Sequence, residues 1–98
     1  MTADTNQQQS LNDTLEERGS RYGCFETHAE VTMRLKRCIR SEMLLRRRTL
    51  ADDQHEALDM ICHKIGRIIN GDPDYADSWH DIAGYAQLVA DRLNGLVR

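Results

Sequence analysis

Two pairs of carboxylates are spaced so that each pair would lie on one side of a helix. Glu56 and Asp59 are three residues apart, and Asp77 and Asp81 are four apart. These spacings bring side chains together on a helical surface. Four such carboxylates converging across a helix pair would bind Mg²⁺ or Mn²⁺. The alternative is a solvated face, because the helix dipole favours acids near a helix start without any function.

Cationic and aromatic side chains lie near these acids in the sequence. Lys64 and Arg67 follow Asp59 on the same stretch, in the order that the helix dipole favours. We expect ligand contacts from four residues: Tyr22, His63, Lys64 and Arg67. The catalytic residues of an enzyme cannot be named from the sequence. Since crowded carboxylates repel one another, Asp81→Asn is expected to raise the melting temperature of the metal-free protein.

The elements that must position these residues are all helical. Proline occurs once, and strong helix formers are plentiful. The polar residues 1–10 are predicted to be a disordered tail, and residues 11–98 a single helical domain. Thr49 and Asp52 resemble a capping box that opens the third helix, and Gly71 ends it. The expected helices span about 11–18, 25–42, 50–70 and 77–94.

The last two helices are expected to pack antiparallel within a small helical bundle, because a short turn joins them. The residues of this contact would be Leu58, Ile61, Ile65 and Ile68 on one helix and Trp79, Ile82, Ala86 and Val89 on the other. Cys38 and Cys62 are expected in the core. The last helix is apolar on more than one side and the core is small, which predicts a homodimer or a larger homo-oligomer.

The charge pattern limits the class of partner. Residues 34–48 contain seven basic residues and one acid, whereas residues 52–91 contain nine acids and two bases. The pI of about 5.7 and the lack of interleaved aromatic residues argue against nucleic acid. The basic run is interpreted as a solvated or subunit-pairing face, and a host protein as its partner stays an alternative. No apolar run could span a membrane, so a cytoplasmic location is expected.

Three separated blocks carry a resemblance to known families: residues 18–25 (RGSRYGCF), 56–73 (EALDMICHKIGRIINGDP) and 77–86 (DSWHDIAGYA). Over about residues 17–94, they resemble a family of small phage and prophage proteins of unknown function. More distantly, the RxxxYG and DxxxDIxGY patterns resemble the MazG-like all-α nucleotide pyrophosphohydrolases. They are similar also to the nucleotide-modification-associated domains of phages.

The resemblance implies a MazG-like protein that binds, and in its enzymatic form hydrolyses, a nucleotide with a divalent metal. Glu56 and Asp59 would stand for the family's first acidic pair, and Asp81 for the last acid of the second pair. Lys64 and Arg67 would then neutralise the phosphate charge of the nucleotide. The position three before Asp81 is Ser78, with Asp77 one residue further back. Because of this departure, a non-catalytic phage protein that binds a ligand or a host protein in the bacterial cytoplasm is the second alternative.

Overall fold

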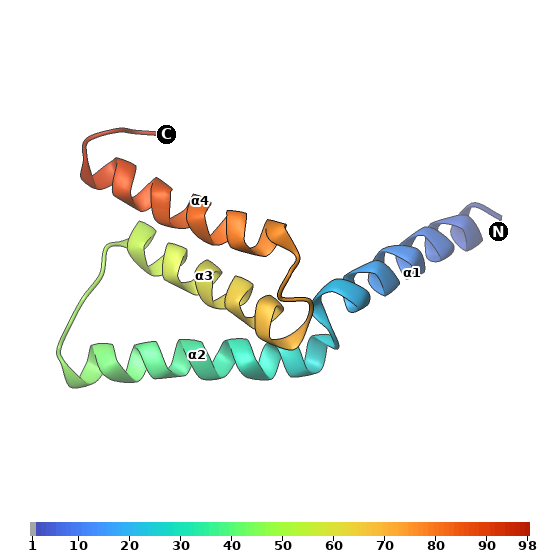
Figure 1. Cartoon of the computed structure of the whole chain (residues 1–98), viewed down its shortest axis with the longest axis horizontal. Coiled ribbons are helices and arrows are strands. Elements are labelled where there is room, and N and C mark those ends of the chain that lie inside the picture. Colours follow the sequence, from blue (N-terminus) through green and yellow to red (C-terminus); the bar gives the residue numbers. More distant parts are fainter. Residues whose placement is uncertain (1) are drawn as a thin grey trace.

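The computed structural model describes the backbone of residues 2–98 and the side chains of residues 6–98. It consists of four α-helices, with no strand in this range (Figure 1). The helices are α1 (Thr2–Tyr22), α2 (Phe25–Leu45), α3 (Asp52–Asn70) and α4 (Ala76–Leu93). The all-α class is therefore confirmed. No helix in the described range combines the length and apolar character that a membrane span requires.

Helices α2, α3 and α4 form an open layer rather than a closed bundle. Helix α3 lies in the middle, packs antiparallel to both neighbours, and separates α2 from α4 (Figure 1). Helix α1 projects from one end of this layer. The expected antiparallel packing of the last two helices is confirmed. Because α2 does not reach α4, both broad sides of α3 lack a covering helix.

Some predicted boundaries were wrong. A single helix, α1, runs through Ser10 and Gly19, where the sequence predicted a start and a stop; Met1 of the expected tail lies outside the described residues. Gly19 is tolerated because one helical glycine costs only about 1 kcal/mol. Helix α3 begins after Ala51, whose N–H donates to Oε1 of Gln54 at 2.9 Å, so Thr49 is not the cap.

The apolar core is thin. Among the described residues, Ala57 and Cys62 are the buried hydrophobic side chains, and Cys38 is exposed, against expectation. Trp79 is 55% exposed, and its Nε1 donates to the carbonyl of Pro73 at 2.8 Å. The prediction that Trp79 packs between the last two helices was wrong. The small residue Ser78 is buried in α4 instead.

A polar joint fixes the end of α1 against the turn between α3 and α4. Nδ2 of Asn70 donates to the carbonyls of Tyr22 and Cys24, at 3.0 and 2.9 Å. A side chain at Gly71 would collide with the backbone of Tyr22, so only glycine permits this approach. Gly23, with a positive φ of 79°, makes the bend between α1 and α2. The blocks at residues 18–25 and 56–73 therefore meet in space.

Candidate functional site

The predicted acidic residues have separate surroundings. Nζ of Lys64 lies 2.9 Å from Oδ2 of Asp81, and this hydrogen bond lowers the pKa of Asp81. The hydroxyl of Tyr75 donates to Asp77 at 2.8 Å. Asp59 lies 3.7 Å from Nε2 of His55 on the same helix. Each of these three carboxylates therefore has a neighbour of its own within the chain.

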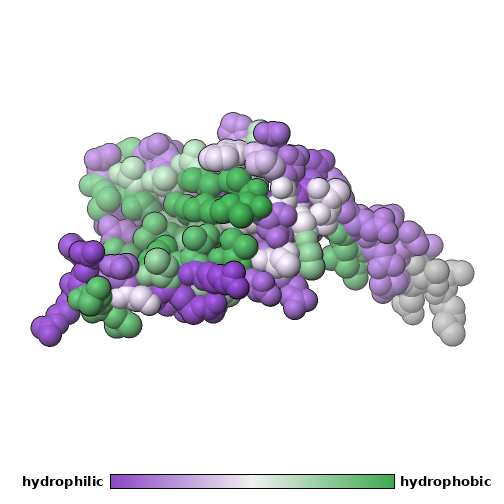
Figure 2. Space-filling view, turned by 60° about the horizontal axis from the view of Figure 1, so that its bottom comes forward, coloured by the Kyte–Doolittle hydropathy of each residue, from purple (hydrophilic) through white to green (hydrophobic). Residues whose placement is uncertain are grey.

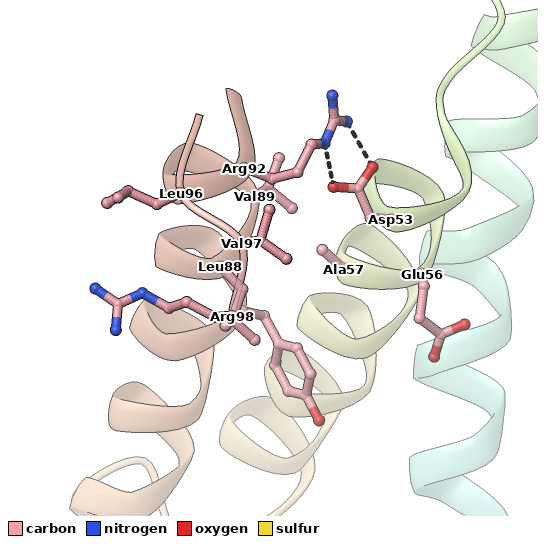
Figure 3. Close-up of a pocket in the computed structure, with 10 residues that line it drawn as sticks. Asp53, Glu56, Ala57, Leu88, Val89, Arg92, Leu96, Val97 and Arg98 are labelled. Atoms are coloured by element: carbon pink, nitrogen blue, oxygen red, sulfur yellow. Dashed lines mark hydrogen bonds and ion pairs between the residues drawn. The ribbon is translucent and has the colours of Figure 1, made fainter. Parts of the chain in front are cut away.

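Glu56, the fourth acid, lines a groove between α3 and α4. Figure 3 shows this groove, a cavity of about 350 Å³, with Glu56 at one edge. Its most prominent polar feature is the fork of two bonds from Arg92 to Asp53, at 2.6 and 2.7 Å. The rest of the lining is largely apolar. Arg98 also lines the groove and pairs with Asp91 at 2.6 Å. Both arginines of the groove are therefore already engaged by carboxylates of the same chain.

The acids do not form the expected cluster within one chain. In the part that the structure describes, no three His, Cys, Asp or Glu side chains lie close enough to hold a metal ion together. The residues therefore do not fit Mg²⁺ or Mn²⁺ in a single subunit, and a metal shared between two copies stays a prediction. The ion pair with Lys64 also reverses the expected effect of Asp81→Asn, because Asp81 compensates a cation rather than crowding other acids.

Three of the four expected ligand residues do come together elsewhere. Tyr22, His63 and Arg67 line a cavity of about 530 Å³ at the junction of α1, α2 and α3. Lys64, the fourth, points to α4 and is buried against Asp81. The cavity is also lined by residues that sequence reasoning did not assign to the site: Leu15, Arg18, Gly19, Gly23, Cys24, Phe25 and His28.

Stacked aromatic and guanidinium groups fix one wall of this cavity. The guanidinium of Arg67 lies over the Tyr22 ring, 4.1 Å from its centroid. The Tyr22 ring contacts Tyr75 at 6.1 Å between centroids, and Arg21 covers Tyr75 at 4.3 Å. Such cation–π contacts are worth about 0.5–2 kcal/mol each. Tyr22 therefore orients Arg67, and the Arg67 guanidinium covers one face of the Tyr22 ring.

Two histidines form the floor of the cavity. Nε2 of His28 lies 3.3 Å from Nδ1 of His63, with the rings edge to face. Burial lowers the pKa of His63 to about 4, and the charge of Arg67 adds to this shift. Burial lowers the pKa of His28 as well. At neutral pH both rings are therefore uncharged. Nδ1 of His28 is buried and has no hydrogen-bond partner among the described residues.

A close approach of α2 and α3 brings these histidines together. Thr32 and His28 are both buried on α2, one turn apart, and Gly66 of α3 packs directly against them. A side chain at position 66 would collide with the Thr32 hydroxyl and crowd the His28 ring. The signal in the sequence was the polar pair His28 and Thr32 on the apolar face of α2, together with an interior helical glycine.

Comparison with models of protein families, with curated proteins and with solved structures finds no match to this chain. The residues and geometry of the junction cavity are therefore the basis on which a function is proposed.

Proposed function

We propose that the protein binds a nucleotide, or a closely similar phosphate-bearing aromatic molecule, in the cavity between α1, α2 and α3. The observation that carries this proposal is the convergence of two arginines and two histidines on one cavity of about 530 Å³. That volume lies within the range of small-molecule sites. The proposal retains the nucleotide expected from the sequence and moves the site away from the acids.

The lining supplies separate groups for the two parts of such a ligand. Arg18 and Arg67 would bind the phosphates, because a guanidinium presents several donors that match phosphate oxygens. Phe25, which is 77% exposed at the start of α2, would stack on the base. His63 would donate to a phosphate oxygen after taking up a proton, which a bound anion favours. Tyr22 would hold Arg67 in place.

Binding without hydrolysis is favoured over the enzymatic alternative. Cleavage of a triphosphate in the expected manner requires carboxylates that hold metal ions beside the phosphates. The described lining of this cavity contains no Asp or Glu. The expected first pair, Glu56 and Asp59, lies outside it. Hydrolysis would therefore need acidic residues from a second copy, whereas binding needs only the residues that already line the cavity.

Isothermal titration calorimetry with a panel of nucleotides, and with inorganic phosphate as the probe of the anion site alone, tests the proposal. Arg67→Gln should weaken nucleotide binding about tenfold to a hundredfold, since a charge-assisted hydrogen bond is worth about 1.5–3 kcal/mol. Phe25→Ala should weaken binding of nucleotides but leave phosphate binding unchanged. Arg37→Gln, an exposed arginine of α2 outside the cavity, is the matched control and should bind normally.

Two results would contradict the proposal. Equal loss of affinity in Arg67→Gln and Arg37→Gln would mean that general positive charge, and not the cavity, attracts the anion. Unchanged nucleotide binding in Arg67→Gln would place the site elsewhere. Adding Mg²⁺ or Mn²⁺ and measuring released pyrophosphate tests the enzymatic alternative in the same samples, and release that Asp81→Asn abolishes would favour it.

A further inference from the structure

One side of the three-helix layer is apolar and has no covering helix. Helix α3 meets α4 through Lys64 and meets α2 through Gly66. At 100° per residue, Leu58, Ile65 and Ile69 lie between these two contact lines, on one broad side of the layer. Leu58 is 36% exposed and Ile69 is 65% exposed. Ile61, Ile65 and Ile68 are half-buried. Part of the stripe expected to form the interior of the protein therefore lies on the outer surface.

Neighbouring helices extend this surface, which we call the apolar face. On α2, Cys38 and Ile39 line a shallow hollow together with Leu58. On α4, Trp79 and Leu93 are 55% and 59% exposed, and the helical period places them on the side away from the groove of Figure 3. Figure 2 shows a broad hydrophobic area over the middle of the molecule, bordered by hydrophilic side chains.

The opposite side of the layer carries charged residues of α3 beside the largely apolar groove, which exposes Leu88. Glu56 and Arg67 lie about half a turn from Ile65 on α3, next to the groove and the junction cavity described above. The layer therefore has one side that could bind a polar ligand and one side that water solvates poorly. A cover over the apolar face would leave the proposed ligand site open.

The exposed area is large for a chain of this size. The structure exposes 7472 Å², whereas a compact monomer of 11.3 kDa exposes about 5,700 Å². The excess of about 1,700 Å² arises from the projecting α1 and from the open layer. A standard interface takes ~800 Å² from each partner, which is about half of this excess.

We propose that a second copy of the chain covers the apolar face, with α3 stacked antiparallel on its own equivalent. The charges favour this partner and this direction. Arg47 and Arg48 lie in the connection before α3, beside Arg46, which is paired with Glu42. Asp72 and Asp74 lie in the turn after α3. An antiparallel twofold arrangement places the basic end of one copy over the acidic end of the other. A parallel arrangement would place like charges together.

Analytical ultracentrifugation and the emission of the single tryptophan test whether the face is an interface. The wild-type protein should sediment as a dimer of about twice 11.3 kDa, and emission of Trp79 should move to longer wavelength on dilution. Ile69→Asp should give a monomer. Leu88→Asp, at a comparably exposed leucine on the groove side, is the matched control and should remain dimeric. A wild-type monomer at high micromolar concentration overturns the proposal, as does a dimer that Ile69→Asp leaves intact.

Disulfide cross-linking tests the direction of the helices, in a background with Cys24→Ser and Cys38→Ser because both native thiols are exposed. Ile61→Cys, near the middle of α3, should cross-link to its own equivalent under oxidation. Ile69→Cys, near the end, should not, because the antiparallel arrangement places it over the start of the partner's α3. Efficient cross-linking through position 69 would overturn the antiparallel arrangement. Raised salt should weaken the wild-type dimer, since the two ends attract each other.

Discussion

Nε2 of His28 on α2 and Nδ1 of His63 on α3 lie 3.3 Å apart at the floor of the junction cavity. Two ring nitrogens at this distance satisfy each other only if one donates a proton and the other accepts it. Burial keeps the pKa of both rings below the ordinary value, so the pair is uncharged at neutral pH. Both histidines also line the cavity in which we propose an anion binds. Protonation of either ring would therefore affect both the packing of α2 on α3 and the binding of the anion.

The stability of the protein should fall as the pH drops from about 6.5 to 4. His63 has a pKa of about 4 in the folded chain, against an ordinary value of 6.5 for a histidine in the unfolded chain. The unfolded chain therefore takes up a proton first, and stability present above pH 6.5 is lost below it. We expect His63 to contribute about 2 kcal/mol of this loss, because partial exposure reduces the full effect. His63→Gln should show a shallower decrease in urea unfolding over this range; parallel curves would contradict the assignment.

Ligand binding should be accompanied by proton uptake. A phosphate next to His63 stabilises the imidazolium, so the pKa of His63 rises in the complex above its value of about 4 in the free protein. Nucleotide affinity should therefore increase as the pH falls from 7 toward 5. Calorimetry in two buffers with different ionisation enthalpies measures the number of protons taken up. That number should drop in His63→Gln, and zero uptake by the wild-type protein would exclude a role for the histidine.

Asp81→Asn should destabilise the protein. The substitution removes the carboxylate that accepts from Lys64, whose side chain is only 10% exposed. Half of the Asp81 side chain is in water, so we expect a loss of about 1 kcal/mol, between the values for exposed and buried pairs. Asp53→Asn, which breaks a pair with both side chains more than 40% exposed, should cost less. Thermal unfolding of both variants checks the order, and a higher melting temperature in Asp81→Asn would instead favour crowded acids.

Two glycine substitutions should act in opposite directions. Gly66→Ala would force a methyl group into the Thr32 hydroxyl and the His28 ring, and overpacking of this kind costs about 1–3 kcal/mol. Gly84→Ala meets nothing within 4 Å on α4 and should stabilise that helix by up to about 1 kcal/mol. Denaturant unfolding measures both. Equal effects of the two substitutions would mean that α2 and α3 leave room for a methyl group at position 66, which would contradict the close contact.

Local patterns identified the helices but not all of their ends. Gly71 ends α3 as expected, because it permits a close approach to Tyr22 that no side chain would allow. Gly19 does not end α1, although it looks equally strong as a stop signal. The difference lies outside the local sequence: Gly71 has a backbone from another segment against it, whereas nothing lies within 4 Å of Gly19.

The candidate ligand residues were partly predictable. Tyr22, His63 and Arg67 were predicted from their chemistry and do line one cavity. His28 was missed because its partner His63 lies on α3, 35 residues away. Phe25, which also lines the cavity, was missed as well. The prediction that the four carboxylates form one cluster was wrong within one chain for a related reason. Helical spacing predicts which carboxylates share a side of one helix, but not whether a lysine on the facing helix will pair with one of them.

Periodicity and turn length in the sequence are enough to predict the helical class, the antiparallel order of α3 and α4, and the apolar stripe through Leu58 and Ile65. What packs against that stripe depends on how the helices meet in three dimensions, which local patterns do not specify. The contact of Gly66 with α2 and the ion pair of Lys64 with Asp81 on α4 direct other sides of α3 toward its neighbours. Leu58 is thereby left exposed on the outer surface, where we propose that a second copy binds.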